Sequence, residues 1–158
     1  MQSLRRRSES LKVHLFGGLG NQLFQVAAGL HLSEVSGQKL EFTIITSLAG
    51  KFARTTDVEL IQALAPGVKI SYNKSRSRAI TLRLSNYTLR KFAFLQKALR
   101  IHTPKELGYS SDVENNDWND LRGHYQTHMF AKVVANRLLH LNLPSTDWFK
   151  QKLEGILS

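Results

Sequence analysis

Residues 17–20 carry three glycines, and they stand between a strand-like segment and a helix-like segment. Glycine has no Cβ and adopts positive φ at little cost, so such a run permits a sharp turn and a close approach of backbone to a ligand. Residues 12–16 have strand character, and from Leu23 apolar residues recur at helical spacing until Gly37, a residue suited to ending a helix. Residues 39–45 alternate as a second strand. The chain is therefore expected to contain a βαβ unit, which indicates an α/β, Rossmann-like fold.

The residues of this turn suit a polar ligand. Asn21 and Gln22 bring carboxamide groups, which both donate and accept hydrogen bonds, to the start of the helix. Unpaired backbone N–H groups and the positive end of the helix dipole also lie there, and they favour phosphate or sugar oxygens. The candidate binding residues are thus Gly17, Gly18, Gly20, Asn21 and Gln22, and positive φ is expected at Gly18.

Two other interpretations of the glycine run stay open. A glycine between strand and helix can serve packing alone. Dinucleotide binding is the other, because Glu41 lies about twenty residues beyond the turn, where an acid that binds ribose would stand. However, Leu23 replaces the third glycine of that fingerprint and is expected to push the helix off the strand. A phosphate-binding P-loop is excluded, because the turn does not end in Gly-Lys-Ser/Thr.

The glycine run belongs to a longer signature. The segment from Gly17 reads Gly-Gly-Leu-Gly-Asn-Gln-Leu-Phe-Gln, with Ala27 and Gly29 beyond it. It resembles the opening signature of the α-1,2-fucosyltransferases, G-G-L-G-N-Q-M-F-Q-Y-A, with Leu23 in place of Met and Val26 in place of Tyr.

A second segment agrees with the same family. From Gly123 the chain reads Gly-His-Tyr-Gln-Thr-His-Met-Phe, which resembles the family segment G-Y-F-Q-S-x-K-Y that follows a strand and opens a helix. Gln126 matches, whereas His124 and Met129 replace the usual Tyr and Lys. Residues 55–64 resemble a short family segment between the two, although Ala63 lacks its aromatic bulk. The resemblance thus spans nearly the whole chain.

One family signature is missing. The segment H-x-R-R-x-D resembles the site that holds the diphosphate of the guanine-nucleotide donor, but none of the six histidines here is followed two residues later by arginine. The chain stops at Ser158, about where that strand should begin. We therefore expect the N-terminal half of a longer enzyme, inactive as this chain alone.

The resemblance implies the N-terminal domain of a GT-B type glycosyltransferase whose donor-binding half is missing. Such an enzyme would transfer L-fucose from GDP-fucose to the 2-hydroxyl of a galactoside with inversion, and it would need neither a metal nor a cofactor. Asn21 and Gln22 would hydrogen-bond sugar or phosphate, and Gln126 would approach from a neighbouring strand end. The catalytic residues stay unassigned.

Composition bounds the class of protein. A chain of 158 residues with 42% hydrophobic residues is sufficient for one domain, expected over residues 12–158 behind a basic tail at residues 1–11. The absence of cysteine excludes disulfides and thiolate sites and is compatible with the cytoplasm. Because Arg5-Arg6-Arg7 is followed by no apolar run of signal or spanning length, neither a signal peptide nor a membrane span is expected.

Charge is unevenly distributed. The net charge is +10, and residues 67–105 contain ten bases and no acid. Two patterns at helical spacing occur there and indicate a long helical region whose apolar stripe is core while the bases lie in solvent. One pattern runs through Ile80, Leu84, Tyr87 and Lys91, and the other through Leu82, Leu89, Phe92, Leu95 and Leu99. Peripheral attachment to an anionic membrane surface stays open. Nucleic-acid binding has the charge but no recognised motif.

The remaining local expectations are brief. Helices are expected from a capping box at Thr56 to Leu64, over residues 127–139, and after Ser145; strands are expected at residues 68–70 and 121–125. Asp117 and Asp120 fall in a predicted polar loop, which does not suggest a carboxylate pair. His124 and His128 straddle a strand-to-helix junction, so a zinc site is not indicated, and each histidine is expected to be an ordinary hydrogen-bonded one. The alternative for the whole chain is an inactive remnant or a domain that binds sugar or nucleotide.

Overall fold

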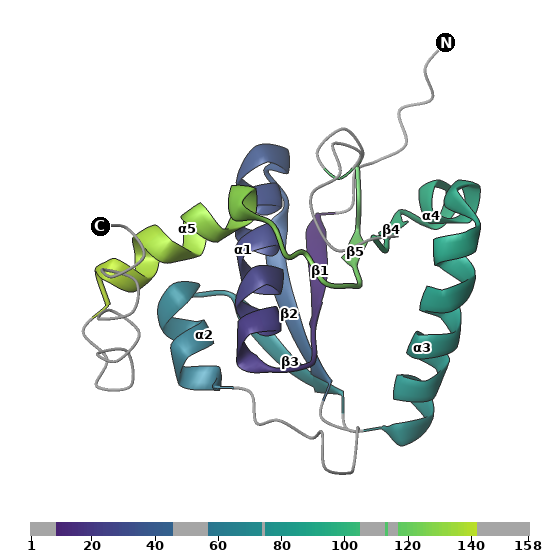
Figure 1. The fold of residues 1–158 in the computed structure, drawn as a ribbon, viewed down its shortest axis with the longest axis horizontal. Helices are drawn as coiled ribbons and strands as arrows, with labels where there is room; N and C mark the ends of the chain where they lie inside the picture. Colours follow the sequence, from purple (N-terminus) through teal and green to yellow (C-terminus); the bar gives the residue numbers. More distant parts are fainter. Residues whose placement is uncertain (1–8, 46–56, 74, 105–112, 114–116, 142–158) are drawn as a thin grey trace.

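The computed structural model describes residues 9–45, 57–73, 75–104, 113 and 117–141. Within these residues strands and helices alternate from Ser10 to Lys91, and a further helix, two short strands and a last helix follow, as Figure 1 shows. Their order is β1 (Ser10–Leu15), α1 (Leu19–Ser36), β2 (Lys39–Ile45), α2 (Val58–Leu64), β3 (Lys69–Asn73), α3 (Arg76–Lys91), α4 (Ala93–Leu99), β4 (Ile101–His102), β5 (Asp120–Leu121) and α5 (His128–Leu139).

The five strands form one sheet in the order β3-β2-β1-β5-β4, and every neighbouring pair is parallel. The predicted βαβ unit is confirmed, because β1 pairs with β2 from Ser10 opposite Lys39 to Leu15 opposite Ile44. Gly37 ends α1 with φ of 72° and donates its backbone N–H to Ser33 O, as expected of a left-handed helix stop. The fold is thus α/β and Rossmann-like.

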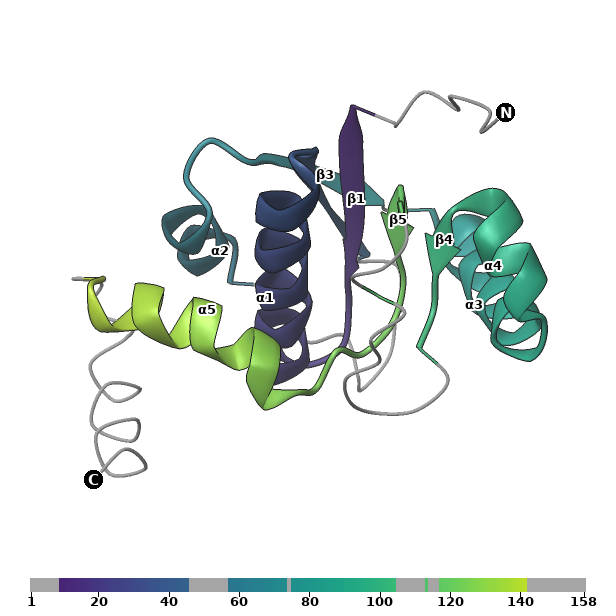
Figure 2. The ribbon, with the colours of Figure 1, turned by 90° about the horizontal axis from the view of Figure 1, so that it is seen from above.

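The helices are not evenly distributed about the sheet. Figures 1 and 2 show α1, α2 and α5 together on one side, whereas α3 and α4 lie at the β4 end of the sheet. The apolar core lies between the first group and the sheet; its buried side chains include Val13, Leu15, Phe42, Ile44, Val26, Ala27, Ile61 and Phe130. Because side chains alternate along a strand, the opposite face carries the polar residues of β1 and β2, among them Lys12, His14 and Thr43.

The closest approach of α1 to the sheet occurs at Gly29. A Cβ built on Gly29 would lie 2.9 Å from Val13 Cγ2 and 3.1 Å from Leu40 Cδ1, so the absence of a side chain there lets the helix lie directly on the strands. Leu23 was expected to push the helix away, yet it is buried in the core. The close contact thus occurs at Gly29, nearly two turns after Leu23.

Several local expectations need correction. The cap of α2 is Asp57, whose side chain accepts a hydrogen bond from Leu60 N at 3.0 Å; Thr56 lies outside the described residues, as does the helix expected after Ser145. β5 covers only Asp120–Leu121, because the chain turns away at Gly123 instead of continuing to residue 125. Asp120 is therefore a strand residue rather than part of a loop. The helix at residues 127–139 is confirmed, with Thr127 as its N-cap.

The expected long helical region is present as α3 and α4, but its burial differs from the prediction. Leu89 is buried and Leu82 partly so, which confirms this pattern as the inner face of α3. Its continuation is not confirmed, because Phe92 and Leu99 are exposed. The other pattern is exposed: Ile80, Leu84 and Tyr87 are more than half accessible to solvent. Both patterns have helical spacing, and a helix at the margin of a small sheet can bury only one of them.

Candidate functional site

The two sequence segments that suggested a ligand site leave adjacent strands at the same edge of the sheet. Residues 16–18 follow the end of β1, and residues 122–126 follow β5, the parallel neighbour of β1. The chain extends from β1 through β2 and β3 to one side, whereas β5 and β4 lie on the other. In open parallel sheets, ligands bind beyond the carboxyl ends of the strands where this change of direction occurs.

The turn itself is set by Gly17. Its φ is 85°, a conformation that side chains rarely adopt, and a Cβ there would lie 3.1 Å from Asn21 Nδ2. Gly18 has φ of −76° and ψ of 164°, so the expected positive φ lies one residue earlier than predicted. Gly18 is the N-cap of α1, and no side chain caps this helix end. The first N–H groups of α1 are therefore left without a side-chain cap at the site.

Gln25 joins the two segments from inside the protein. It is fully buried; its Oε1 accepts from Phe16 N at 3.0 Å, and its Nε2 donates to Gly123 O at 2.9 Å. One side chain thus pairs the backbone at the end of β1 with the backbone beyond β5, over 98 positions of sequence. Gly123 also needs its small size, because a Cβ there would overlap the ring of Pro104. The edge of the site is held by buried contacts that a ligand does not have to supply.

A second contact joins the segments at the surface. Gln126 Nε2 donates a hydrogen bond to Asn21 Oδ1, and the Gln126 side chain is exposed. Gln126 therefore lies beside the glycine turn, as expected. Each of the two carboxamides keeps further donor or acceptor capacity beyond this bond. Asn21 and Gln126 together form an amide pair at the mouth of the turn.

Gln22 and Gly20 do not contribute a side chain to the surface of the turn, as Asn21 and Gln126 do. Gln22 is 1% exposed, and its Nε2 donates to Gly17 O at 2.9 Å, so its amide supports the turn from within. Gly20 lies exposed in the first turn of α1, and a Cβ there would meet nothing within 4 Å. Among the predicted binding residues, Gly17, Gly18 and Asn21 therefore lie at the surface of the turn with Gln126, while Gln22 acts behind it.

His124 is the residue that the sequence interpretation missed. Its ring lies 5.1 Å from the Phe16 ring, and its Cε1 would be 3.7 Å from a Cβ on Gly17. The ring is half-buried, and its Nδ1 has no hydrogen-bond partner among the described residues. Burial, with the positive charge of Arg90 as a second cause, lowers the pKa of His124 below its ordinary value. The imidazole is therefore neutral near pH 7.

The signal for His124 was present in the sequence. His124 lies between Gly123 and Gln126 in the second matched segment, where the family carries an aromatic residue. A sequence gives neither burial nor distance, so it does not distinguish His124 from the other five histidines. Only the register of β5 against β1 brings this one to the glycine turn.

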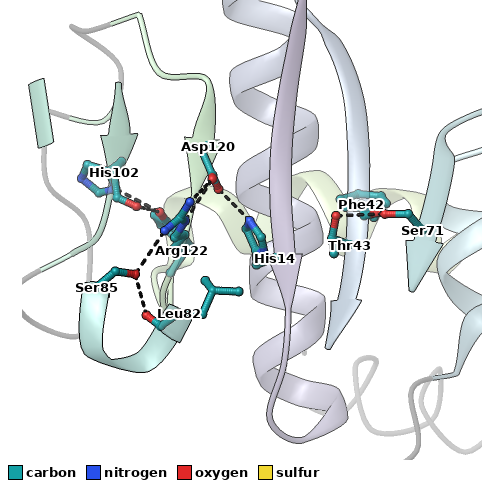
Figure 3. Close-up of polar contacts among 10 residues, drawn as sticks. His14, Phe42, Thr43, Ser71, Leu82, Ser85, His102, Asp120 and Arg122 are labelled. Atoms are coloured by element: carbon teal, nitrogen blue, oxygen red, sulfur yellow. Dashed lines mark hydrogen bonds and ion pairs between the residues drawn. The ribbon is translucent and has the colours of Figure 1, made fainter. Parts of the chain in front are cut away.

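A partly buried polar network lies on the other face of the same two strands. Figure 3 shows His14 from β1 pointing toward Asp120 of β5, with Nε2 2.9 Å from Oδ1, and Arg122 on the far side of that carboxylate. Arg122 binds Asp120 Oδ2 through Nη2 at 2.6 Å and through Nε at 2.9 Å. Its Nη1 donates to Ser85 Oγ of α3 at 3.3 Å. The network fixes β5 against β1 and ties both to α3.

The pKa of Asp120 reflects this setting. Burial would raise the pKa of Asp120, but its contacts with His14 and with the Arg122 guanidinium lower it below the ordinary value of an aspartate. Asp120 therefore stays ionised, and a carboxylate in such a network is a structural anion rather than a proton donor. Nearby, the Tyr125 hydroxyl lies 3.0 Å from His102 Nδ1, and burial raises the pKa of Tyr125 well above its ordinary value.

Two other kinds of site receive no support. Glu41 is level with Lys12 in the β1–β2 register, well before the carboxyl end of β2, and it pairs with Lys69 at 3.6 Å. It is thus poorly placed to bind a ribose at the glycine turn. Within the described ranges no group of three His, Asp or Glu side chains converges as a metal site requires. No helix of these ranges is long and apolar enough to cross a membrane.

Comparison with protein-family models, with curated protein sequences and with solved structures gives no match.

Proposed function

We propose that this chain is the N-terminal half of a GT-B type galactoside α-1,2-fucosyltransferase and that its glycine turn forms one wall of the substrate cleft. The observation that supports this most is the joining of residues 17–25 with residues 123–126 through Gln25 and through the Asn21–Gln126 bond. Both segments resemble signatures of that family, and a shared binding site explains why signatures so far apart in sequence belong together.

The chemistry expected of the turn is recognition of hydroxyl or phosphate oxygens. Asn21 and Gln126 offer amide N–H donors and carbonyl acceptors, and the uncapped start of α1 offers backbone N–H groups. A sugar hydroxyl both donates and accepts hydrogen bonds, as the two amides do. A sugar is therefore a better ligand for this pair than a simple ion. Here the resemblance and the geometry favour the same class of ligand.

We further propose that His124 takes part in the transfer step. Inverting transfer requires a base to accept the proton of the attacking hydroxyl, and a histidine that is neutral near pH 7 can do so through a ring nitrogen. His124 lies beside Gly17 and Asn21, and the lowered pKa keeps its imidazole unprotonated. His14, in contrast, lies 2.9 Å from Asp120 in a contact between strands.

The expected activity of this chain by itself is binding without transfer. The sequence lacks H-x-R-R-x-D, so nothing corresponds to the family segment that would stabilise the departing diphosphate. This absence favours the second candidate, a domain that binds sugar or nucleotide but does not catalyse. Incubation with GDP-fucose and a β-galactoside should give no fucosylated product; turnover on the order of one per second would contradict the need for that segment.

Binding can be tested by nuclear magnetic resonance on the ¹⁵N-labelled full chain. Lactose and GDP-fucose are titrated separately, and saturable shifts are expected in the side-chain amide signals of Asn21 and Gln126 for at least one of them. Gln126→Ala should weaken that binding by about tenfold, the effect of losing one good hydrogen bond. Gln62→Ala removes an exposed glutamine from α2 and is the matched control, which should bind like the wild type.

The proposal fails if neither ligand shifts these amides, or if saturable shifts occur but Gln126→Ala and Gln62→Ala bind alike. Tight binding of nucleic acid with shifts at the same amides would instead favour a different class of function. His124→Gln adds a separate readout: ligand binding by this chain should be retained, because the proposed role of His124 is proton acceptance and not affinity.

A further inference from the structure

The outward face of α3 carries a row of apolar side chains that are exposed to solvent. Ile80, Leu84 and Tyr87 follow one another at spacings of four and three residues, and they are 53%, 65% and 62% exposed. The inner face of the helix is already occupied by Leu82, Ser85 and Leu89, so this row points away from the sheet. An apolar row of this kind on a helix usually marks an interaction surface.

The row continues into α4. Phe92 and Phe94 at the junction of the two helices are exposed, and their rings lie 6.0 Å apart. Leu99 at the end of α4 is also exposed. We call the exposed residues Ile80, Leu84, Tyr87, Phe92, Phe94 and Leu99 the α3–α4 surface. Of the ten large apolar side chains found exposed in the described part of the chain, these six lie within residues 80–99, so the exposure is concentrated here.

Positive charge accompanies the same surface. Lys91 lies with its Nζ 4.6 Å from the centre of the Tyr87 ring, and Arg90, Lys91 and Lys97 are exposed. Residues 67–105 contain ten Lys or Arg and no Asp or Glu, so no acidic side chain of this segment neutralises them. An anionic partner is therefore favoured over a neutral one, and a second copy of a chain with net charge +10 is disfavoured by repulsion.

Hydrogen bonds hold α3 and α4 to each other and to the sheet. The buried Gln96 donates from Nε2 to Leu89 O at 2.9 Å and accepts from Thr103 N at Oε1, also at 2.9 Å. These bonds join α4 to the end of α3 and to the segment after β4. Arg122 and Ser85 attach α3 to β5. Docking would therefore need little ordering of the backbone.

We propose that the α3–α4 surface binds the surface of an anionic lipid bilayer. Leucine, isoleucine and aromatic side chains would enter the boundary between headgroups and acyl chains, while the lysines meet anionic headgroups. Nucleic acid fits less well, because a phosphate backbone offers nothing to an exposed apolar row. This inference does not depend on which ligand the glycine turn binds.

The test uses sedimentation of the full chain with vesicles of phosphatidylcholine alone or with about 30% phosphatidylserine. Binding is expected only to the anionic vesicles and should be released by salt, since surface charges are screened. Two double variants separate the contributions. Leu84→Ser with Tyr87→Ser should weaken binding by tenfold or more, and Lys91→Gln with Lys97→Gln by about 30-fold, because each base near the membrane counts for roughly a fivefold change.

Val35→Ser is the matched control, since Val35 is equally exposed but lies on α1 away from the basic tract. Its vesicle binding should equal that of the wild type. Heparin binding should be weakened by the lysine variant but not by the Leu84 and Tyr87 variant, because heparin offers charge without an apolar phase. Circular dichroism confirms that all variants stay folded, as expected for exposed side chains.

Three results would overturn the proposal. Neutral vesicles could bind as well as anionic ones, or the Leu84 and Tyr87 variant could bind anionic vesicles as the wild type does. In the third, the wild type is a dimer, and the Leu84 and Tyr87 variant is a monomer that binds vesicles as the wild type does. The α3–α4 surface would then be the contact between two copies of the chain.

Discussion

Two regions of the molecule depart from the usual rule that polar side chains are exposed and apolar side chains are buried. The edge of the sheet at the carboxyl ends of β1 and β5 buries polar side chains, whereas the helices α3 and α4 expose apolar ones. At the edge, the carboxamides of Gln22 and Gln25 are buried, and Gln25 has both ends of its amide hydrogen-bonded. On α3, Leu84 and Tyr87 are more than half exposed. Burying an amide is unfavourable unless it is paired, and exposing an apolar side chain forgoes its burial energy.

This contrast distinguishes two kinds of interaction surface. The edge uses buried polar bonds to hold a backbone turn in one geometry, which suits a small polar ligand. The helices leave apolar area uncovered, which suits an extended partner. If the contrast is correct, substitutions behind the edge should cost stability, whereas substitutions on the α3–α4 surface should cost almost none.

The largest effect is expected from Gln25→Leu. The change leaves the part-buried Phe16 N and the buried Gly123 O without their side-chain partner, at about 1–3 kcal/mol for each group left unpaired. We expect the free energy of unfolding to fall by about 4 kcal/mol, measured by urea denaturation. Leu84→Ser on α3 is the contrasting variant and should stay within about 0.5 kcal/mol of the wild type. Equal losses in the two variants would remove the distinction between the regions.

Two glycines of α1 sharpen the comparison within one helix. Gly29→Val places a branched side chain against Val13 and Leu40, and overpacking of this kind should cost about 3 kcal/mol. Gly20→Ala meets nothing within 4 Å, so it should stabilise the protein by up to about 1 kcal/mol through helix propensity. Thermal denaturation of both variants measures the difference. A destabilised Gly20→Ala would mean that this helix end needs glycine for its backbone conformation.

The sequence predicted the βαβ unit and the helix α5, because local periodicity determines these features. The position of Gln126 beside the turn followed from the family resemblance rather than from local pattern. The sequence did not reveal which apolar pattern of α3 would face the sheet, since both Leu82 and Leu84 belong to sets with helical spacing. It also missed Gln25, His124 and Asp120, whose partners lie up to about a hundred residues away. Such long-range pairings depend on strand register, which one sequence does not specify.

A pH dependence tests the network that connects the two regions. The folded pKa of Asp120 is lowered, so its ionic contacts contribute stability that is fully present above the ordinary aspartate pKa of about 4. That contribution should be lost as the pH falls through the lower folded pKa. Unfolding free energy measured from pH 6 downward should decline less steeply for Asp120→Asn than for the wild type. Parallel slopes for the two proteins would contradict the role of Asp120.

The smallest effect on stability, and the most informative about function, is expected from Asn21→Ala. Asn21 lies at the mouth of the turn, and its bond to the exposed Gln126 is open to solvent, so unfolding free energy should change by under about 1 kcal/mol. Ligand binding at the turn should nevertheless fall, because an amide that contacts the ligand is removed. In an enzyme completed with a donor half, fucosyl transfer should drop sharply, since the lost contact would act in the transition state. Gly17→Val is the counterpart: at φ of 85° a branched residue is strained, so both stability and binding should suffer. If Asn21→Ala unfolds the protein or leaves binding intact, Asn21 serves the start of the helix and the turn is a packing device.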